Sequence, residues 1–285
     1  MTSKRLVLEM ASIFGDESAD EKAQIVFVVA ALIGPDSQWE TAVSEWLEIT
    51  KGEEFHATEW EWGHGLDSYN DLARVISASG LRGQAVAIDL PAFRAAFPDL
   101  KTLDYAYHKC FIEVVDKLID VAKEQGYKDL KFTFDGRQGQ GTTGLLYDSI
   151  TGQKEWADAF SFADEISFGN RKNPRIQMAD MVARETMKAY LSGLENVDRE
   201  PFRILGSADK RIWFDFLIED YFSQWRDGLR ELEKTTGLYA TEYFAWIKRK
   251  GMQDNLNSKI RFVIWQDANA FRERNGEKTR ISEIR

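Results

Sequence analysis

Acidic residues lie near the expected ends of strands and starts of helices, where α/β proteins commonly have their catalytic and binding residues. Asp16 and Glu17 follow one apolar run, Asp135 ends another, and Asp180 lies one turn into a later helical stretch. In such folds, ligands bind outside the carboxyl ends of strands and at the starts of helices. Sites made only of carboxylate oxygens suit Mg²⁺ or Mn²⁺, and a pair of such ions activates water for phosphoryl displacement. Together these positions are typical of a divalent-metal site.

Asp180 is the most informative of these residues, and it has a second explanation. On a helical wheel that sets Ile176 at 0°, Asp180 falls at about 40°, inside the apolar stripe. A carboxylate that faces a core needs a cation, a metal or several hydrogen bonds, because burying a lone charge is costly. An ion pair with Arg184 would meet that need without a metal. Glu185 falls at about 180° and is expected to point away.

Turns would explain the other acidic positions. Asp135 precedes a glycine, and Asp16-Glu17-Ser18 suits the loop of a hairpin. His56 and Glu59 would form a ligand pair, a general base with its partner, or a hydrogen-bonded surface pair. The glycine-rich run 136–141 lacks the lysine of a phosphate-binding loop and matches no dinucleotide fingerprint.

The elements that must position these residues alternate between strands and helices. Strand runs separated by helices favour parallel crossovers, whereas the first two runs are close enough for an antiparallel hairpin. We therefore expect a mixed α/β domain over residues 1–195 and a mostly helical extension over residues 196–285, in which 209–233 has an aromatic amphipathic face. The expected strands are 5–14, 24–33, 83–90, 129–135 and 159–168, and the expected helices are 38–50, 68–79, 103–125, 142–154 and 174–191.

Composition bounds the class of protein. With 285 residues and 44% hydrophobic residues, the chain can bury a sizeable core. Its one cysteine, Cys110, excludes an internal disulfide framework and a cysteine-based zinc site. No apolar run approaches the roughly 18 residues of a membrane span, and no secretory signal is visible. We expect a soluble cytoplasmic protein.

Charge is distributed unevenly along the chain. A net charge of −10 argues against a protein that coats duplex nucleic acid non-specifically, which needs many phosphate contacts. Residues 246–285 nevertheless carry ten Lys or Arg against five Asp or Glu. This basic tail would reach phosphates locally, or it would be a solvated, frayed end.

Four short motifs give the chain a family resemblance. Asp16-Glu17-Ser18 resembles an opening D-E-S-G motif, Phe55-His56-Ala57 a short H-x motif, and Phe134-Asp135 the acidic end of a middle strand. The run 174–183, PRIQMADMVA, resembles a P-G-L-Q-L-A-D-L-V-A helix and is the most specific of the four. These motifs are similar to those of the bacterial proteins grouped as domain of unknown function 3800, which are placed in the RNase H-like superfamily. The likeness covers about residues 5–193.

The resemblance implies an RNase H-like core, in which helices flank a mixed sheet, and a carboxylate site for Mg²⁺ or Mn²⁺. By motif, Asp16, Asp135 and Asp180 would be the metal ligands and the catalytic residues. In the metal-free protein these carboxylates should repel one another and raise the pKa of at least one of them. The residues expected to support them are Glu17, His56, Glu59 and Gln177.

The chain departs from the family pattern in two places. Ala19 stands where the family often has glycine, and residues 169–173 replace an Asp-Ser-Lys-like stretch before the helix. The second departure removes an acidic group near the site. We expect Arg171, Lys172 and Arg175 to face phosphates of the substrate instead.

The function that follows is a divalent-metal-dependent nuclease, which would hydrolyse phosphodiester bonds of DNA or RNA with a carboxylate-bound metal pair. Two alternatives stay open. One is a non-catalytic module that binds nucleic acid or protein on the same fold, and the other is a metal-dependent hydrolase of a small phosphorylated molecule. Nucleic acid is the expected partner, and the oligomeric state is open, with a homodimer as one option.

Overall fold

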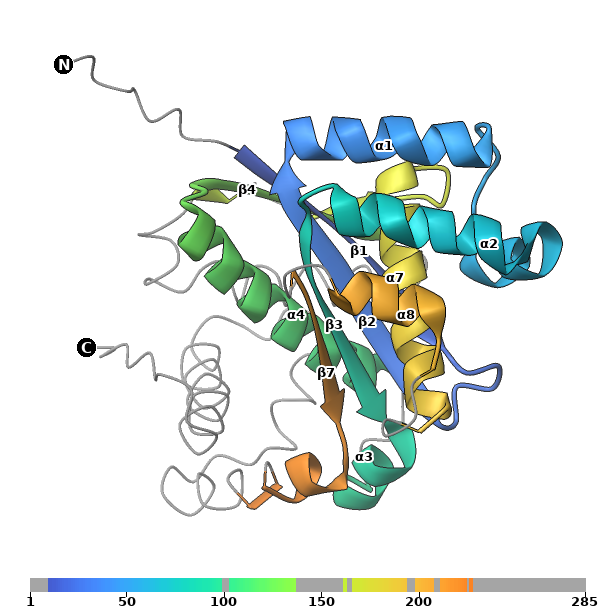
Figure 1. Cartoon of the computed structure of the whole chain (residues 1–285). Coiled ribbons are helices and arrows are strands. Elements are labelled where there is room, and N and C mark those ends of the chain that lie inside the picture. Colours follow the sequence, from blue (N-terminus) through green and yellow to red (C-terminus); the bar gives the residue numbers. More distant parts are fainter. Residues whose placement is uncertain are drawn as a thin grey trace.

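A mixed sheet with helices on both faces forms the centre of the protein (Figure 1). The computed structural model describes residues 10–98, 103–136, 161–162, 166–193, 198–207, 211–224 and 226–227. The strands are β1 (Met10–Ala19), β2 (Val26–Pro35), β3 (Arg82–Asp89), β4 (Asp129–Asp135), β5 (Ser161–Phe162), β6 (Ser167–Gly169) and β7 (Ile212–Leu217).

The order of the strands across the sheet is β5-β4-β1-β2-β3-β7. β6 also pairs with β4, along its last three residues, whereas β5 pairs with its first two. Neighbours β1, β2 and β3 are antiparallel, whereas β4 runs parallel to β1 and β7 runs parallel to β3. The expected α/β class, with an antiparallel hairpin and a helical crossover between β3 and β4, is confirmed.

Helices bury both faces of this sheet. In Figure 1, α4 lies on one face, and α1, α2 and α7 lie on the other. Because both faces are covered, every residue of β2 is buried and its sequence is apolar rather than alternating. The helices are α1 (Asp36–Thr50), α2 (Ala57–Ala78), α3 (Leu90–Ala96), α4 (Leu103–Gln125), α7 (Pro174–Leu191) and α8 (Glu200–Ser207).

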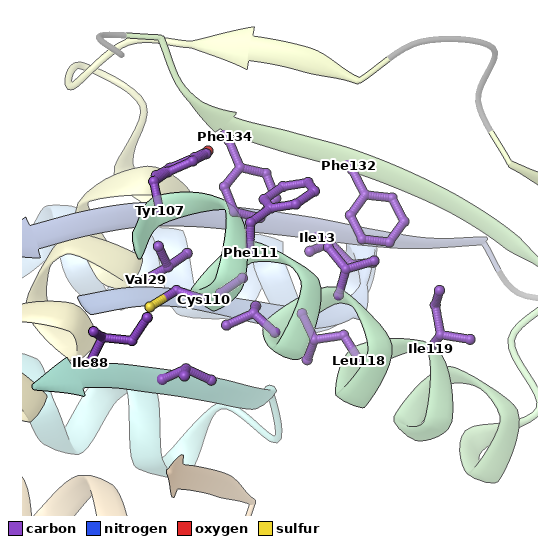
Figure 2. Close-up of a cluster of buried hydrophobic side chains, with 14 of the residues drawn as sticks. Ile13, Val29, Ile88, Tyr107, Cys110, Phe111, Leu118, Ile119, Phe132 and Phe134 are labelled. Atoms are coloured by element: carbon purple, nitrogen blue, oxygen red, sulfur yellow. The ribbon is translucent and has the colours of Figure 1, made fainter. Parts of the chain in front are cut away.

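The core on the α4 side fixes the strands that carry the acidic residues. Figure 2 shows Phe132 and Phe134 of β4 directed toward the side chains of α4, among them Phe111. The Phe134 ring also lies against the backbone of β1, where a Cβ atom on Gly15 would come within 2.3 Å of it. Gly15 is therefore required for β1 and β4 to pack as they do, one residue before Asp16.

Several predicted boundaries are wrong. β1 extends to Ala19 because it pairs with β2 as far as Phe27, so Asp16 and Glu17 lie inside a strand rather than in a hairpin loop. The helix predicted over 68–79 begins at Ala57 and contains a kink at Gly65, whose φ is 82°. Helices α4 and α7 match their predicted ranges 103–125 and 174–191.

The sheet also continues past the expected end of the α/β domain. Residues 212–217, predicted as part of an amphipathic helix, form the edge strand β7 and pair with β3. Their sequence, IWFDFL, is rich in aromatic residues that suit a half-buried strand. The division of the chain at residue 195 stays a prediction, and the predicted helix 142–154 and the basic tail lie outside the described residues. Within the described part, no helix is long and apolar enough to cross a membrane.

Candidate metal centre

Three carboxylates meet where β1 and β4 run side by side. Gly15 is in register with Phe134, so Asp16 and Asp135 follow at neighbouring positions of two parallel strands. Carboxylate oxygens of Asp16, Glu17 and Asp135 lie within 4.8 Å of one another. Asp16 and Asp135 are buried, with 5% and 4% of their surface exposed.

Asp180 reaches the same place from α7, which packs across β1 and β2. Among the charges that act on the Asp16 carboxyl group, that of Asp180 has the largest effect, ahead of Glu17 and Asp135. Oδ2 of Asp180 accepts a hydrogen bond of 3.0 Å from the backbone N–H of Ala57 at the start of α2. Asp180 is thus a fourth carboxylate that adjoins the cluster of Asp16, Glu17 and Asp135.

The pKa of Asp16 is raised well above its usual range. Burial is the main cause, and the negative charges of Asp180, Glu17 and Asp135 add to it. The backbone N–H of Glu17, which donates to Oδ1 of Asp16 over 2.8 Å, acts in the opposite direction but does not outweigh them. The expected repulsion is confirmed for this residue, and it means that the cluster favours a bound cation.

The donor set fits a hard divalent cation. Oxygens that bind one Ca²⁺ ion lie up to about 5 Å apart, and those that bind one Mg²⁺ ion up to about 4 Å. The oxygens of Asp16, Glu17 and Asp135, within 4.8 Å of one another, meet the first limit as they stand and need to close by less than about 1 Å for the second. Because all three donors are carboxylate oxygens, Mg²⁺, Mn²⁺ or Ca²⁺ suits the site better than a thiolate-seeking or imidazole-seeking metal.

Phe55 explains how a backbone N–H comes to face Asp180. Its buried ring packs edge-on against Trp46 at 4.9 Å and contacts Trp60 at 5.7 Å, which fixes the chain just before α2. The first N–H groups of a helix have no partner within the helix and carry partial positive charge. Ala57 therefore stabilises the Asp180 carboxylate. Our sequence reasoning missed this role, although the start of a helix directly after a buried aromatic residue would have indicated it.

His56 and Glu59 are less closely tied to the carboxylates. His56 is the N-cap residue of α2, and its Nδ1 is buried without a hydrogen-bond partner. It lies 3.9 Å from Oε1 of Glu59, too far for a hydrogen bond, and the Glu59 side chain is 82% exposed. Glu59 therefore lies in solvent, whereas His56 is next in sequence to the N–H donor of Asp180.

Gln177 has a structural role in this geometry. Its Oε1 accepts a hydrogen bond from Nε1 of Trp46 at 3.1 Å, and its Nε2 donates to the carbonyl oxygen of Arg171 at 2.7 Å. These bonds tie the start of α7 to α1 and to the turn before α7. Gln177 thus helps to position the helix that carries Asp180.

The alternative explanation of Asp180, an ion pair with Arg184, does not occur between these described residues. The wheel assumed one apolar stripe, but α7 is enclosed by β1, β2, α2 and α8 and is buried on almost every side. Asp180 is consequently on the more accessible edge of the helix. Glu185, expected to point outward, is fully buried and accepts two 2.7 Å hydrogen bonds from Arg199.

The basic candidates divide into two groups. Arg175 lies 3.4 Å from Asp36 and over the rings of Phe14 and Trp39, at 5.2 and 5.8 Å, so its charge serves the packing of α7 on α1. Arg171 and Lys172 lie in the turn that follows β6. Since Gly169 of β6 is in register with Asp135, this turn leaves the sheet beside the carboxylates.

Comparisons with known proteins give a faint structural likeness. No protein-family model and no curated protein matches the sequence. Among solved structures, RNase H3 of Aquifex aeolicus is 14% identical with a TM-score of 0.36, covering 68% of this chain and 60% of its own. RNase HII of Archaeoglobus fulgidus, in a PCNA:RNase HII complex, is 14% identical with a TM-score of 0.38, covering 88% of this chain and 100% of its own. This chain thus spans about 60% of the RNase H3 chain, and at such scores the likeness carries no functional argument.

Proposed function

We propose that the protein is a divalent-metal-dependent phosphodiesterase that acts on DNA or RNA. The observation that carries this proposal is the gathering of Asp16, Glu17 and Asp135 within 4.8 Å, on strands whose packing requires Gly15 beside them. The proposal includes membership of the domain of unknown function 3800 family, which the motif around Asp180 supports. Mg²⁺ and Mn²⁺ are the proposed metals.

Each residue has a distinct part in the proposed reaction. Asp16, Glu17 and Asp135 would hold the metal, and Asp180 would complete the negative site from α7. When bound, the metal ions supply an activated water and neutralise the charge that develops on the phosphate. The N–H groups of Glu17 and Ala57 fix the orientation of the Asp16 and Asp180 carboxylates.

Positive and proton-accepting groups would complete the site. Arg171 and Lys172, in the turn beside Asp135, would contact substrate phosphates. His56, the N-cap residue of α2, is next in sequence to Ala57, whose N–H bonds to Asp180. His56 would thus assist the reaction from the start of α2.

A cleavage assay tests the proposal. Purified protein with Mn²⁺ or Mg²⁺ should cut at least one of single-stranded DNA, duplex DNA, RNA–DNA hybrid and structured RNA. Asp16→Asn and Asp135→Asn should reduce the rate to background, because each keeps the size of the side chain and removes a charge that holds the metal. Asp71→Asn is the control, since Asp71 is exposed and pairs with Arg74 on α2.

Two results would contradict the proposal. If no nucleic acid is cut under any divalent metal while the protein binds one tightly, the fold serves as a binding module or acts on a small phosphorylated molecule. If cutting survives both changes in the cluster, the activity does not arise from these carboxylates.

A further inference from the structure

Helix α7 exposes a narrow edge beside the carboxylates. Between Ile176 and Ala189, the residues that are not buried are Asp180, Arg184 and Lys188. They are spaced four residues apart, so they follow one another on the same side of the helix at about 6 Å per step. This edge carries one acid and two bases, and the acid adjoins the metal centre.

The two bases on this edge differ in their partners. Lys188 forms an ion pair with Glu61 of α2, and Arg199 bridges Glu61 and Glu185. Two acids therefore neutralise two bases in a closed group that joins α2, α7 and the start of α8. Arg184 takes no part in it.

Arg184 is a base without an acid. No carboxylate among the described residues forms an ion pair with it, although Asp180 is one turn away, and its buried Nε has no hydrogen-bond partner. An Nε–H that is buried without a partner costs free energy in the protein alone. An anion that binds beside the guanidinium group supplies the missing acceptor.

We infer that Arg184 binds a phosphate of the substrate at the carboxylate site. Guanidinium groups bind phosphate through two parallel hydrogen bonds, and Arg184 is one turn from Asp180 on the accessible edge of α7. The inference rests on the proposed phosphodiesterase function and identifies a phosphate-binding residue on α7, distinct from the turn at Arg171 and Lys172.

Binding of nucleic acid by folded variants tests this inference. The probes are fluorescein-labelled single-stranded DNA and duplex DNA of about 20 nucleotides, with Ca²⁺ in place of Mn²⁺ to limit cleavage, over a range of salt concentrations. For Arg184→Met we expect about tenfold weaker binding. The slope of log K against log salt should fall by about 0.7 for the single strand and about 0.9 for the duplex.

Two further variants separate this contact from general charge effects. Arg74→Met removes one positive charge from an exposed ion pair on α2 and should leave affinity and slope unchanged. Arg184→Lys keeps the charge but loses the paired hydrogen bonds, so its slope should be that of the wild type and its affinity several-fold lower. If Arg184→Met does not fold, equal binding by Arg184→Lys and the wild type overturns the inference.

The outcomes distinguish this inference from the proposed function. The increase in melting temperature that divalent metal produces should persist in Arg184→Met, and loss of that increase would mean that Arg184 acts through the carboxylates. Equal binding by Arg184→Met and the wild type would refute the phosphate contact and leave the phosphodiesterase proposal intact. A wild-type protein that binds neither probe, and neither RNA nor RNA–DNA hybrid of the same length, would refute both.

Discussion

Replacing Asp16 with Asn should remove most of the effect of metal on stability. A ligand that binds only the folded state at 100 times its dissociation constant stabilises it by about 2.7 kcal/mol. For a domain of this size, 1 kcal/mol shifts the melting temperature by about 2–4 °C, so saturating Mn²⁺ should raise it by about 5–10 °C. Asp16→Asn should abolish most of this rise, because Asp16 is a member of the oxygen cluster.

The same change should stabilise the protein when metal is absent. The pKa of Asp16 is raised in the folded state, mainly by burial and then by Asp180, so ionising it at neutral pH opposes folding. The stability of the metal-free wild type should therefore fall as pH rises from about 4, the usual pKa of Asp, through the raised value. Asn has no proton to lose, so the variant should lack this fall and melt above the metal-free wild type at pH 7.

Differential scanning calorimetry with EDTA and with Mn²⁺, between pH 4 and pH 8, measures both effects. Asp71→Asn, on the exposed surface of α2, should behave as the wild type. The reasoning fails if Asp16→Asn retains the full shift with Mn²⁺, or if it melts below the wild type at pH 7 in EDTA. The first result would mean that Asp16 does not hold the metal, and the second that contacts in the metal-free protein stabilise the Asp16 carboxylate rather than destabilise it.

Three further results should follow. Burial lowers the pKa of His108 to about 4, so this residue should reduce the free energy of unfolding by about 3 kcal/mol between pH 7 and pH 4. His108→Gln should lose this contribution, and a variant whose melting temperature falls with acid as steeply as that of the wild type would contradict the prediction. Arg199→Met leaves the buried Glu185 without its ion pair and should lower the free energy of unfolding in urea by about 3 kcal/mol. The ion pair of Arg203 with Glu200 is exposed, so Arg203→Met should lower it by less than about 1 kcal/mol. Equal losses would refute the ion-pair argument. Deleting residues 272–285, which lie outside the described part, should weaken nucleic-acid binding and reduce its salt dependence, and an unchanged slope would indicate a frayed end.

Helices α4 and α7 were predictable because their apolar residues repeat with a helical period, whereas the hairpin was predicted without its correct bounds. Helix α7 begins at Pro174 after the N-cap Asn173, as its sequence indicates. β7 was not predictable in the same way, because an edge strand exposes part of each face and its aromatic residues also fit a helical stripe. Pairing with β3, which is distant in sequence, decides between the two.

The acidic positions were predictable as a set, but their arrangement was not. The sequence placed Asp135 at the end of a strand, as observed, but placed Asp16 after a strand, whereas it lies inside β1. The parallel register of β1 and β4 brings the two residues together. That Glu17 joins the cluster while Asp180 adjoins it depends on where side-chain oxygens point, which no periodicity encodes. The bond from Ala57 to Asp180 links residues 123 positions apart, so it emerges only from the tertiary packing of α2 and α7.

The distribution of charge on α7 has a consequence for the metal centre. Lys188 and Arg199 pair with Glu61 and Glu185, so both bases are neutralised within their own group. Arg184, one turn from Asp180, is the base on this edge of α7 that forms no ion pair among the described residues. The lowered pKa of Glu61, whose burial is outweighed by its contacts with Lys188 and Arg199, shows that it stays ionised at neutral pH. The ion pairs that join α2 to α7 therefore stabilise the fold and leave Arg184 as the base on this edge that the proposed substrate phosphate would meet.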